Sequence, residues 1–308
     1  MDYNSLPGYG KDNWIKYKWN RSYQNPYPKN DFECFLRPTG NSSVIPFHKA
    51  TENAVADIYE YHGKELYLAM SGGIDSEHVA NTLVKLKIPF TPIIVTLNKE
   101  NLLDTWWADR WCRINKIEPT IINIVQDEYV EDLINHAKKF CSIMTAGSVT
   151  VKHVLDHVNE RNGALLTGMG FNELYIPDPI MYEEEHDPTL KDKDGNMKQG
   201  YLQSEADLIK LLLAKDNHPM TVLNWSPEVT LSYIHARDPN LSTEENRFNI
   251  FGCLPRPKIA LPMDRRMINS AKYKNFTQLL EHVGTTKSYY LGSTEHLINL
   301  LSKGLQNV

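Results

Sequence analysis

Short apolar runs alternate with segments of helical periodicity from residue 50 onward. Four runs are almost continuously apolar, as strands buried on both faces of a sheet are, and they cover residues 66–70, 90–97, 119–125 and 164–170. Around them apolar residues recur with the period of a helix, which predicts helices over residues 50–63, 76–86, 102–117, 128–140 and 149–161. Strands that alternate with helices predict an α/β fold, with a parallel-stranded sheet and helices on both faces.

Residues 171–200 interrupt this alternation, because they are polar and rich in turn-forming residues. Such an insertion predicts a lid over a site. Beyond it the pattern predicts a helix over 204–217, a short strand over 220–225, and a helix that begins at Ser226-Pro227-Glu228. We therefore expect three parts: an aromatic-rich N-terminal arm and hairpin over 1–48, an α/β domain over 49–240 that includes the lid, and a C-terminal extension on the substrate side over 241–308.

Composition and charge narrow the class of protein. The chain has 308 residues, of which 41% are hydrophobic and 23% are charged, as in an ordinary globular protein. No apolar run is long enough to span a membrane and the first residues lack a secretory signal, so we expect a cytoplasmic protein without a membrane partner. The net charge of −5 does not predict a broad nucleic-acid-binding face. The four cysteines are widely spaced, which predicts reduced thiols rather than disulfides or zinc ligands: Cys34, Cys112, Cys141 and Cys253.

Residues 1–30 carry seven aromatic side chains, and five basic residues against two aspartates. Interleaved rings and cations can hold a nucleic-acid strand, so a nucleic-acid partner stays open although the overall charge does not imply one. Aromatic rings are mainly packing groups, and we favour an arm whose rings pack on the body of the protein.

The hexapeptide SGGIDS, residues 71–76, joins a predicted buried strand to a predicted helix. Glycines allow a tight turn and a close approach of a ligand to the backbone, and the free N–H groups of a first helical turn attract anions. Ser71 and Ser76 add hydroxyl donors, whereas Asp75 would repel a phosphate unless a cation lay between them. Because Mg²⁺ prefers carboxylate and phosphate oxygens, the pattern predicts a site for a metal-bound polyphosphate.

SGGIDS resembles the PP-loop of the N-type ATP pyrophosphatases, also called the adenine nucleotide alpha hydrolase-like superfamily. Members include the synthetase domain of asparagine synthetase, GMP and NAD synthetases, tRNA-thiolating enzymes and phosphoadenosine phosphosulfate reductase. The resemblance covers residues 50–240 and implies a site for ATP and Mg²⁺, with cleavage between the α and β phosphates. It implies that Asp75 is the metal ligand, and that the nucleotide is bound by the loop residues and by backbone groups that end the second strand: Ser71, Gly72, Gly73, Ile74, Asp75, Ser76, Val95, Thr96 and Leu97.

A second segment, LLTGMGFNEL at residues 165–174, is similar to the asparagine synthetase segment S-G-E-G-S-D-E. This similarity implies that Gly168 and Gly170 allow a close approach of the backbone to the α-phosphate or the substrate, and that Glu173 acts in catalysis. Two acidic positions of the asparagine synthetase segment are replaced in this chain, by Met169 and Asn172.

The resemblance implies an adenylating enzyme of the asparagine synthetase-like kind that converts ATP to AMP and pyrophosphate. The acceptor would be a carboxylate or amide-like oxygen on a small molecule or nucleobase. There is no room for a glutaminase domain before residue 50, so the nucleophile would be external, as an amine, ammonia or a sulfur donor. Lys258, Arg265 and Arg266 are candidates to neutralise the departing pyrophosphate, as oriented cations do in phosphate chemistry, and simple surface charge is the equal alternative.

Two alternatives stay open. A sulfur-handling enzyme is suggested by residues 219–234, whose W-S-P-E sequence is similar to a segment of phosphosulfate reductases, and Cys253 would then be the candidate nucleophile. A nucleotide-binding module without catalysis is suggested by the two replaced acidic positions. His153 and His157 lie one helical turn apart, a spacing that can bind metal, but the pattern supplies no third ligand.

Overall fold

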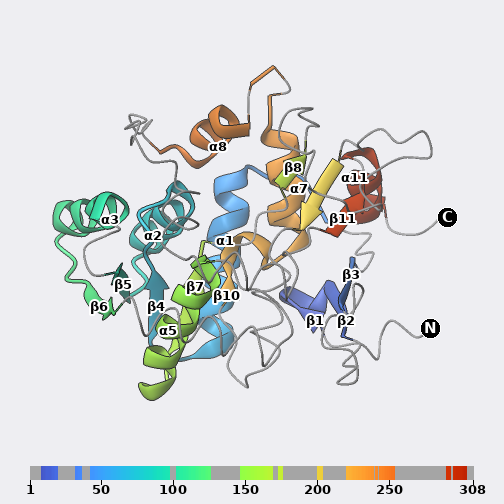
Figure 1. The fold of residues 1–308 in the computed structure, drawn as a ribbon. Helices are drawn as coiled ribbons and strands as arrows, with labels where there is room; N and C mark the ends of the chain where they lie inside the picture. The colour runs from blue at the N-terminus through green and yellow to red at the C-terminus, as the bar shows by residue number, and fades with distance from the viewer. Residues whose placement is uncertain are drawn as a thin grey trace, which may run out of the picture.

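The computed structural model (Figure 1) describes a central parallel sheet, two smaller antiparallel sheets and the helices around them. The central sheet is built from strands that lie between residues 66 and 221. The described residues are 8–19, 32–36, 42–97, 102–125, 146–168, 173–175, 200–203, 220–238, 240–241, 243–253, 289–292 and 294–303.

The central sheet has five strands in the order β10-β7-β4-β5-β6, and all its pairs are parallel. This confirms the predicted parallel sheet. The predicted strand over 220–225 is shorter than expected, because the chain continues after Thr221 as a 3₁₀ turn, η4 (Val222–Asn224). The strands are β4 (Leu66–Ala69), β5 (Phe90–Leu97), β6 (Thr120–Ile124), β7 (Ala164–Thr167) and β10 (Met220–Thr221).

The strand order reverses next to β4. Strands β5 and β6 follow β4 on one side, whereas β7 and β10 lie on its other side. The register pairs Leu66 with Ala164, and Leu68 with Leu166, so the carboxyl ends of β4 and β7 lie side by side. In open α/β sheets, ligands bind outside the carboxyl ends of the strands at such a switch point. Here the switch point is bordered by the loop after β4 and by Gly168.

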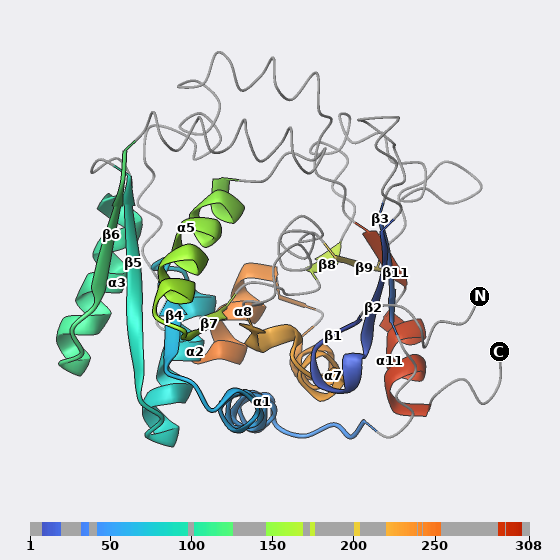
Figure 2. The same cartoon turned by 90° about the horizontal axis from the view of Figure 1, so that it is seen from below.

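Helices lie on both faces of the central sheet, as predicted (Figure 2). On one face, α1 (Phe47–His62), α2 (Ile74–Leu86) and α3 (Leu102–Asn115) share a core with alternate strand residues such as Leu68 and Leu166. The next residues along these strands point to the opposite face. That face is covered by α5 (Ala146–Glu160), which buries Val151, Val154, Leu155 and Val158.

Two antiparallel sheets of three strands each accompany the central sheet. In the first, β2 pairs with both β1 and β3. The segment FECFLRPTGNSSVIPF predicts a hairpin with its turn at residues 38–43, and this prediction is wrong, because the described residues 42–46 after β3 form no strand. In the second, the two described ends of the predicted lid, β8 and the start of β9, pair with each other. The strands are β1 (Gly8–Tyr9), β2 (Ile15–Trp19), β3 (Phe32–Leu36), β8 (Glu173–Tyr175), β9 (Gly200–Gln203) and β11 (Tyr289–Gly292).

The remaining described helices are η2 (Lys11–Asn13), α7 (Pro227–Ala236), α8 (Thr243–Phe251) and α11 (Thr294–Lys303). Helix α7 begins where the sequence predicts, with Ser226 at the N-cap and Pro227 in the first turn. In the described part of the chain, no helix has the length and apolar character needed to cross a membrane.

The start of the N-terminal segment packs on the loop that precedes α7. The ring of Trp14 is fully buried and its Nε1 donates to the carbonyl oxygen of Asn224 at 3.1 Å. Tyr9 is also buried, with its hydroxyl 2.6 Å from Thr221 Oγ1. The expected packing of the aromatic arm is therefore confirmed for these two rings.

Candidate functional site

Helix α2 begins directly after β4, through a loop that contains both glycines of SGGIDS. Gly72 has a φ of 81°, which a residue with a Cβ adopts only with strain, and Gly73 is the N-cap. The first backbone bond of α2 runs from Glu77 N to Gly73 O at 3.1 Å. The N–H groups of residues 74–76 therefore precede the first intrahelical bond and point out of the helix end.

The two serines hold this loop in shape. Gly73 N donates to Ser71 Oγ at 3.2 Å, and Ser76 Oγ donates to Gly73 O at 3.0 Å. The two hydroxyl oxygens lie 3.3 Å apart. Ser71 is exposed whereas Ser76 is buried, so one hydroxyl faces outward and the other supports the turn from within.

The neighbouring strand β7 closes the inner side of the loop. A Cβ on Gly168 would stand 2.6 Å from the backbone carbon of Asp75 and 2.6 Å from Ser76 N. The close approach that the sequence predicts at Gly168 is therefore made to the backbone of α2. A side chain there would push α2 away from β7, so Gly168 fixes the position of the first helical turn.

Asp75 forms an ion pair that the sequence did not predict. Arg247 Nη2, from α8, donates to Asp75 Oδ2, and the two side chains are 27% and 26% exposed. The other carboxylate oxygen, Asp75 Oδ1, is buried and has no hydrogen-bond partner among the described residues. The carboxylate is thus half satisfied, with one oxygen left to accept a further ligand.

Helix α8 is held against α2 by stacked rings. Phe251, one turn after Arg247, stacks on His78 with ring centroids 5.0 Å apart, and on Phe47 at 5.6 Å. Burial, together with the neighbouring His48, lowers the pKa of His78 to about 4, so this ring is neutral near pH 7. Cys253 is buried in the same core, with its Sγ 3.7 Å from Ile74 O.

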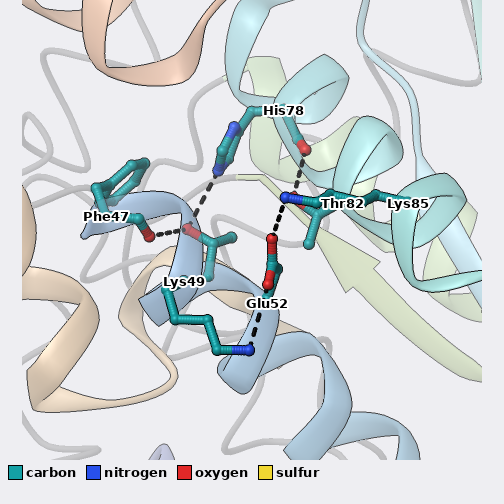
Figure 3. A network of polar contacts seen from close by, with 7 residues as sticks. Phe47, Lys49, Glu52, His78, Thr82 and Lys85 are labelled. Carbon is teal, nitrogen blue, oxygen red and sulfur yellow. Dashed lines mark hydrogen bonds and ion pairs between the residues drawn. The ribbon is translucent and has the colours of Figure 1, made fainter. Parts of the chain in front are cut away.

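A polar network ties α1 to α2 behind the loop (Figure 3). His78 Nε2 lies 3.1 Å from Thr51 Oγ1, and that hydroxyl donates to Phe47 O at 3.0 Å. Further along the helices Glu52 pairs with Lys85 at 2.5 Å and with Lys49 at 3.4 Å, and these bonds lower the pKa of Glu52. The network holds α2 against α1 at His78 and, in the last turn of α2, at Lys85, without using any group of the loop itself.

The structure brings together most of the predicted nucleotide-binding residues. The loop residues Ser71 to Ser76 lie at the end of β4, and Val95 to Leu97 end the adjacent strand β5. Met70 N donates to Ile93 O at 2.8 Å, which continues the pairing of β4 with β5 by one residue, and Val95 to Leu97 lie beyond this point and pair with β6. Glu173 lies in β8, in a different sheet from β7. Other predicted residues lie outside the described residues: Gly170, Lys258 and Arg265.

The start of α2 and the end of β7 offer buried oxygen atoms that fit Mg²⁺, the ion that the sequence predicts. The unpartnered Asp75 Oδ1 is an oxygen donor of the kind that Mg²⁺ prefers, and Thr167 Oγ1, next to Gly168, is also buried without a partner among the described residues. Within the same residues there is no cluster of three or more His, Cys, Asp or Glu side chains that could hold a metal. The residues therefore fit an ion that shares its coordination with a phosphate and water, and His153 and His157 gain no third ligand.

Comparisons with known proteins give similarity of structure only. No protein-family model and no curated protein matches the sequence. The chain is similar to an NH3-dependent NAD synthetase from Campylobacter jejuni, with 23% identity over 41% of this chain and 57% of the other, and a TM-score of 0.29. It is similar to the NMN synthetase of Francisella tularensis, with 16% identity over 70% of this chain and 90% of the other, and a TM-score of 0.36. A glutamine-dependent NAD+ synthetase from Acinetobacter baumannii matches with 17% identity over 44% of this chain and 29% of the other, and a TM-score of 0.32.

Proposed function

We propose that this protein is an ATP-dependent adenylating enzyme that cleaves ATP to AMP and pyrophosphate. Its acceptor is a carboxylate or amide-like oxygen, which is then attacked by an external amine or ammonia. The observation that carries the proposal is the junction of β4 and α2. A glycine in the left-handed region, a helix start with open N–H groups and a half-satisfied carboxylate meet there, at the switch point of a parallel sheet.

The loop residues would bind the pyrophosphate part of ATP. The N–H groups of residues 74–76 and the outward hydroxyl of Ser71 donate hydrogen bonds to phosphate oxygens, and the positive end of the α2 dipole adds to their attraction. Because these donors are fixed by Gly72, Ser76 and Gly168, they need no rearrangement as charge develops on the leaving group.

Asp75 Oδ1 would hold Mg²⁺, which when bound neutralises phosphate charge at the site. The backbone at the end of β5, Val95 to Leu97, belongs to the strand that pairs with β4 and would hold the adenine. The polyphosphate and the adenine would then lie on neighbouring strand ends, with the α-phosphate between them. An acceptor oxygen that reaches the α-phosphate there displaces pyrophosphate and becomes adenylated.

The first test is a product assay on ATP labelled at the α- and γ-phosphates, with Mg²⁺, ammonium and an extract of small metabolites. Wild type is expected to release AMP and pyrophosphate in an extract-dependent way. Asp75→Asn, which keeps the shape of the side chain and removes its charge, is expected to lose about a hundredfold or more of this rate. Asp109→Asn is the matched control, because Asp109 also pairs with an arginine, Arg113, but lies on the exposed part of α3.

Release of ADP and phosphate would contradict the proposal. Binding of ATP with no AMP formed under any condition would favour a nucleotide-binding module instead. The sulfur-handling alternative has a test of its own. Cys253 is buried and packs among core side chains, so we expect Cys253→Ser to retain activity, and a complete loss in a folded variant would favour thiol chemistry.

A further inference from the structure

Arg247 places a guanidinium at the start of α2 although it belongs to a distant helix. It lies 172 residues after Asp75 in the chain and reaches that carboxylate from α8. The packing of Phe251 on His78 and Phe47 fixes α8 one turn further on. The position of Arg247 is therefore set by the fold and does not depend on a flexible surface contact.

The pair balances charge at a site that must accept an anion. Asp75 alone, in the first turn of α2, would repel a polyphosphate that approaches the N–H groups of residues 74–76. With Arg247 on Oδ2 the carboxylate is neutralised, while Oδ1 stays without a partner among the described residues. A metal ion on Asp75 would take over this neutralisation. The carboxylate would then no longer need the guanidinium as its counter-ion, and the guanidinium would lie close to the bound phosphate.

We propose that Arg247 is a pyrophosphate-binding residue that Asp75 holds in the absence of metal. When Mg²⁺ occupies Asp75, the guanidinium donates its N–H groups to the phosphate, for which its planar fork is well suited. This inference rests on the proposed function of the same site. It assigns to Arg247 the role that the sequence alone assigns to Lys258 and Arg265, and it makes metal and pyrophosphate bind cooperatively.

The proposal predicts effects of opposite sign for two ligands. Arg247→Met removes a cation that competes for Asp75, so the affinity for Mn²⁺ alone, measured by electron paramagnetic resonance, is expected to rise about tenfold. The same substitution removes a phosphate ligand, so the affinity for inorganic pyrophosphate in saturating Mg²⁺, measured by calorimetry, is expected to fall about tenfold. Both sizes correspond to one charged hydrogen bond.

Two further variants make these measurements decisive. Arg113→Met removes the arginine of an exposed pair on α3 and is expected to change neither affinity. Arg247→Lys keeps the charge without the fork, and is expected to leave the Mn²⁺ affinity near that of wild type while pyrophosphate binding weakens about threefold. If Arg247→Met does not fold, as judged by circular dichroism, the pyrophosphate measurement on Arg247→Lys decides.

A role as a structural brace gives a different result. In that case both affinities fall together in Arg247→Met, or neither changes, and pyrophosphate binding is unchanged in Arg247→Lys; each of these outcomes overturns the proposal. Neither ligand is turned over, so the result is independent of the product assay. If the Mn²⁺ and pyrophosphate affinities of Arg247→Met shift in opposite directions but no AMP is formed, the role of Arg247 stands and the adenylating activity is rejected. If AMP is formed but the two affinities do not shift in opposite directions, the adenylating activity stands and the role of Arg247 is rejected.

Discussion

The starts of α2 and α7 are two helix beginnings in one α/β domain with opposite surroundings. Both follow a strand of the central sheet, both have a serine close to the N-cap, and both carry an acid in the first turn, Asp75 or Glu228. At α2, Ser71 is exposed and Asp75 partly so. At α7, Ser226 and Pro227 are buried, and the carbonyl oxygen of Trp225 accepts a hydrogen bond from Lys11 N at 2.6 Å.

We infer from this difference that a helix start can serve as an anion site only where its first turn is left uncovered. Proline at the first turn of α7 removes one N–H donor, and the N-terminal segment fills the space in front of it: a Cβ on Gly10 would stand 2.6 Å from Trp225 O. The loop before α2 is instead open in front and braced behind, by Gly168 and by the ring of His78. The start of α2 therefore keeps the features of the proposed anion site, whereas the start of α7 is packed in the core.

The largest expected effect is a loss of unfolding free energy at the buried start of α7. Trp14→Ala removes a fully buried ring that donates to Asn224 O, and such a loss costs about 3–5 kcal/mol of unfolding free energy. Because this ring bonds to η4 and not to the loop before α2, pyrophosphate affinity per folded molecule should not change. Urea denaturation and calorimetry measure the two quantities. Trp106→Ala, at a ring that is 46% exposed, is the control and should cost about 1 kcal/mol.

The stability that the buried ring of His78 gives to the packing of α2 should decrease at acidic pH. The pKa of His78 is about 4 in the folded protein against 6.5 for the free side chain, and burial is the main cause. Between these values the unfolded chain takes up a proton that the folded chain does not. The contribution of the neutral His78 ring to the unfolding free energy is therefore complete above pH 6.5. It is lost as the pH falls towards 4, by about 3 kcal/mol in total.

Unfolding in urea at pH 7, 6, 5 and 4 measures this loss, and replacement by asparagine separates it from the titration of carboxylates. His78→Asn should be less stable at pH 7 but should lose less stability on acidification. The exposed His235 provides the control variant, His235→Asn. If wild type and His78→Asn lose stability in parallel, the buried ring does not carry the acid response.

The starts of α2 and α7 also show which features of the site could be predicted from the sequence. The loop before α2 was predictable because its glycines, hydroxyls and acid are contiguous, and because a continuous apolar run marks β4 as buried. The sequence predicted that position 168 needs a glycine. It did not predict that the backbone of α2 imposes this need, because only the strand order of the sheet places β7 beside β4. Arg247 gave no signal: the polar segment TEENRFNIF has the composition of a solvated helix, and the fold alone brings it to Asp75.

A smaller expected effect comes from alanine substitutions at two glycines, which separate the cost of backbone strain from the loss of pyrophosphate binding. Gly72→Ala places a Cβ on a residue with a φ of 81°, which costs about 1–2 kcal/mol of stability, and it narrows the loop that would hold the phosphate. Gly63→Ala at the end of α1 introduces similar strain, with a φ of 55°, into open space. Both variants should lose similar stability in urea, but only Gly72→Ala should weaken the binding of pyrophosphate with Mg²⁺. Equal pyrophosphate affinities would mean that the loop is not the anion site.

The smallest expected effect compares the serines of the two junctions. Ser226 makes no side-chain capping bond at α7, so Ser226→Ala should change the unfolding free energy by no more than about 0.5 kcal/mol and leave pyrophosphate binding intact. Ser76 donates to Gly73 O and supports the turn, so Ser76→Ala should cost about 1 kcal/mol and weaken pyrophosphate binding severalfold. Thermal unfolding and calorimetry on the two variants check both. If Ser226→Ala weakens binding as much as Ser76→Ala, the buried start of α7 is coupled to the site, and the contrast between the two helix starts fails.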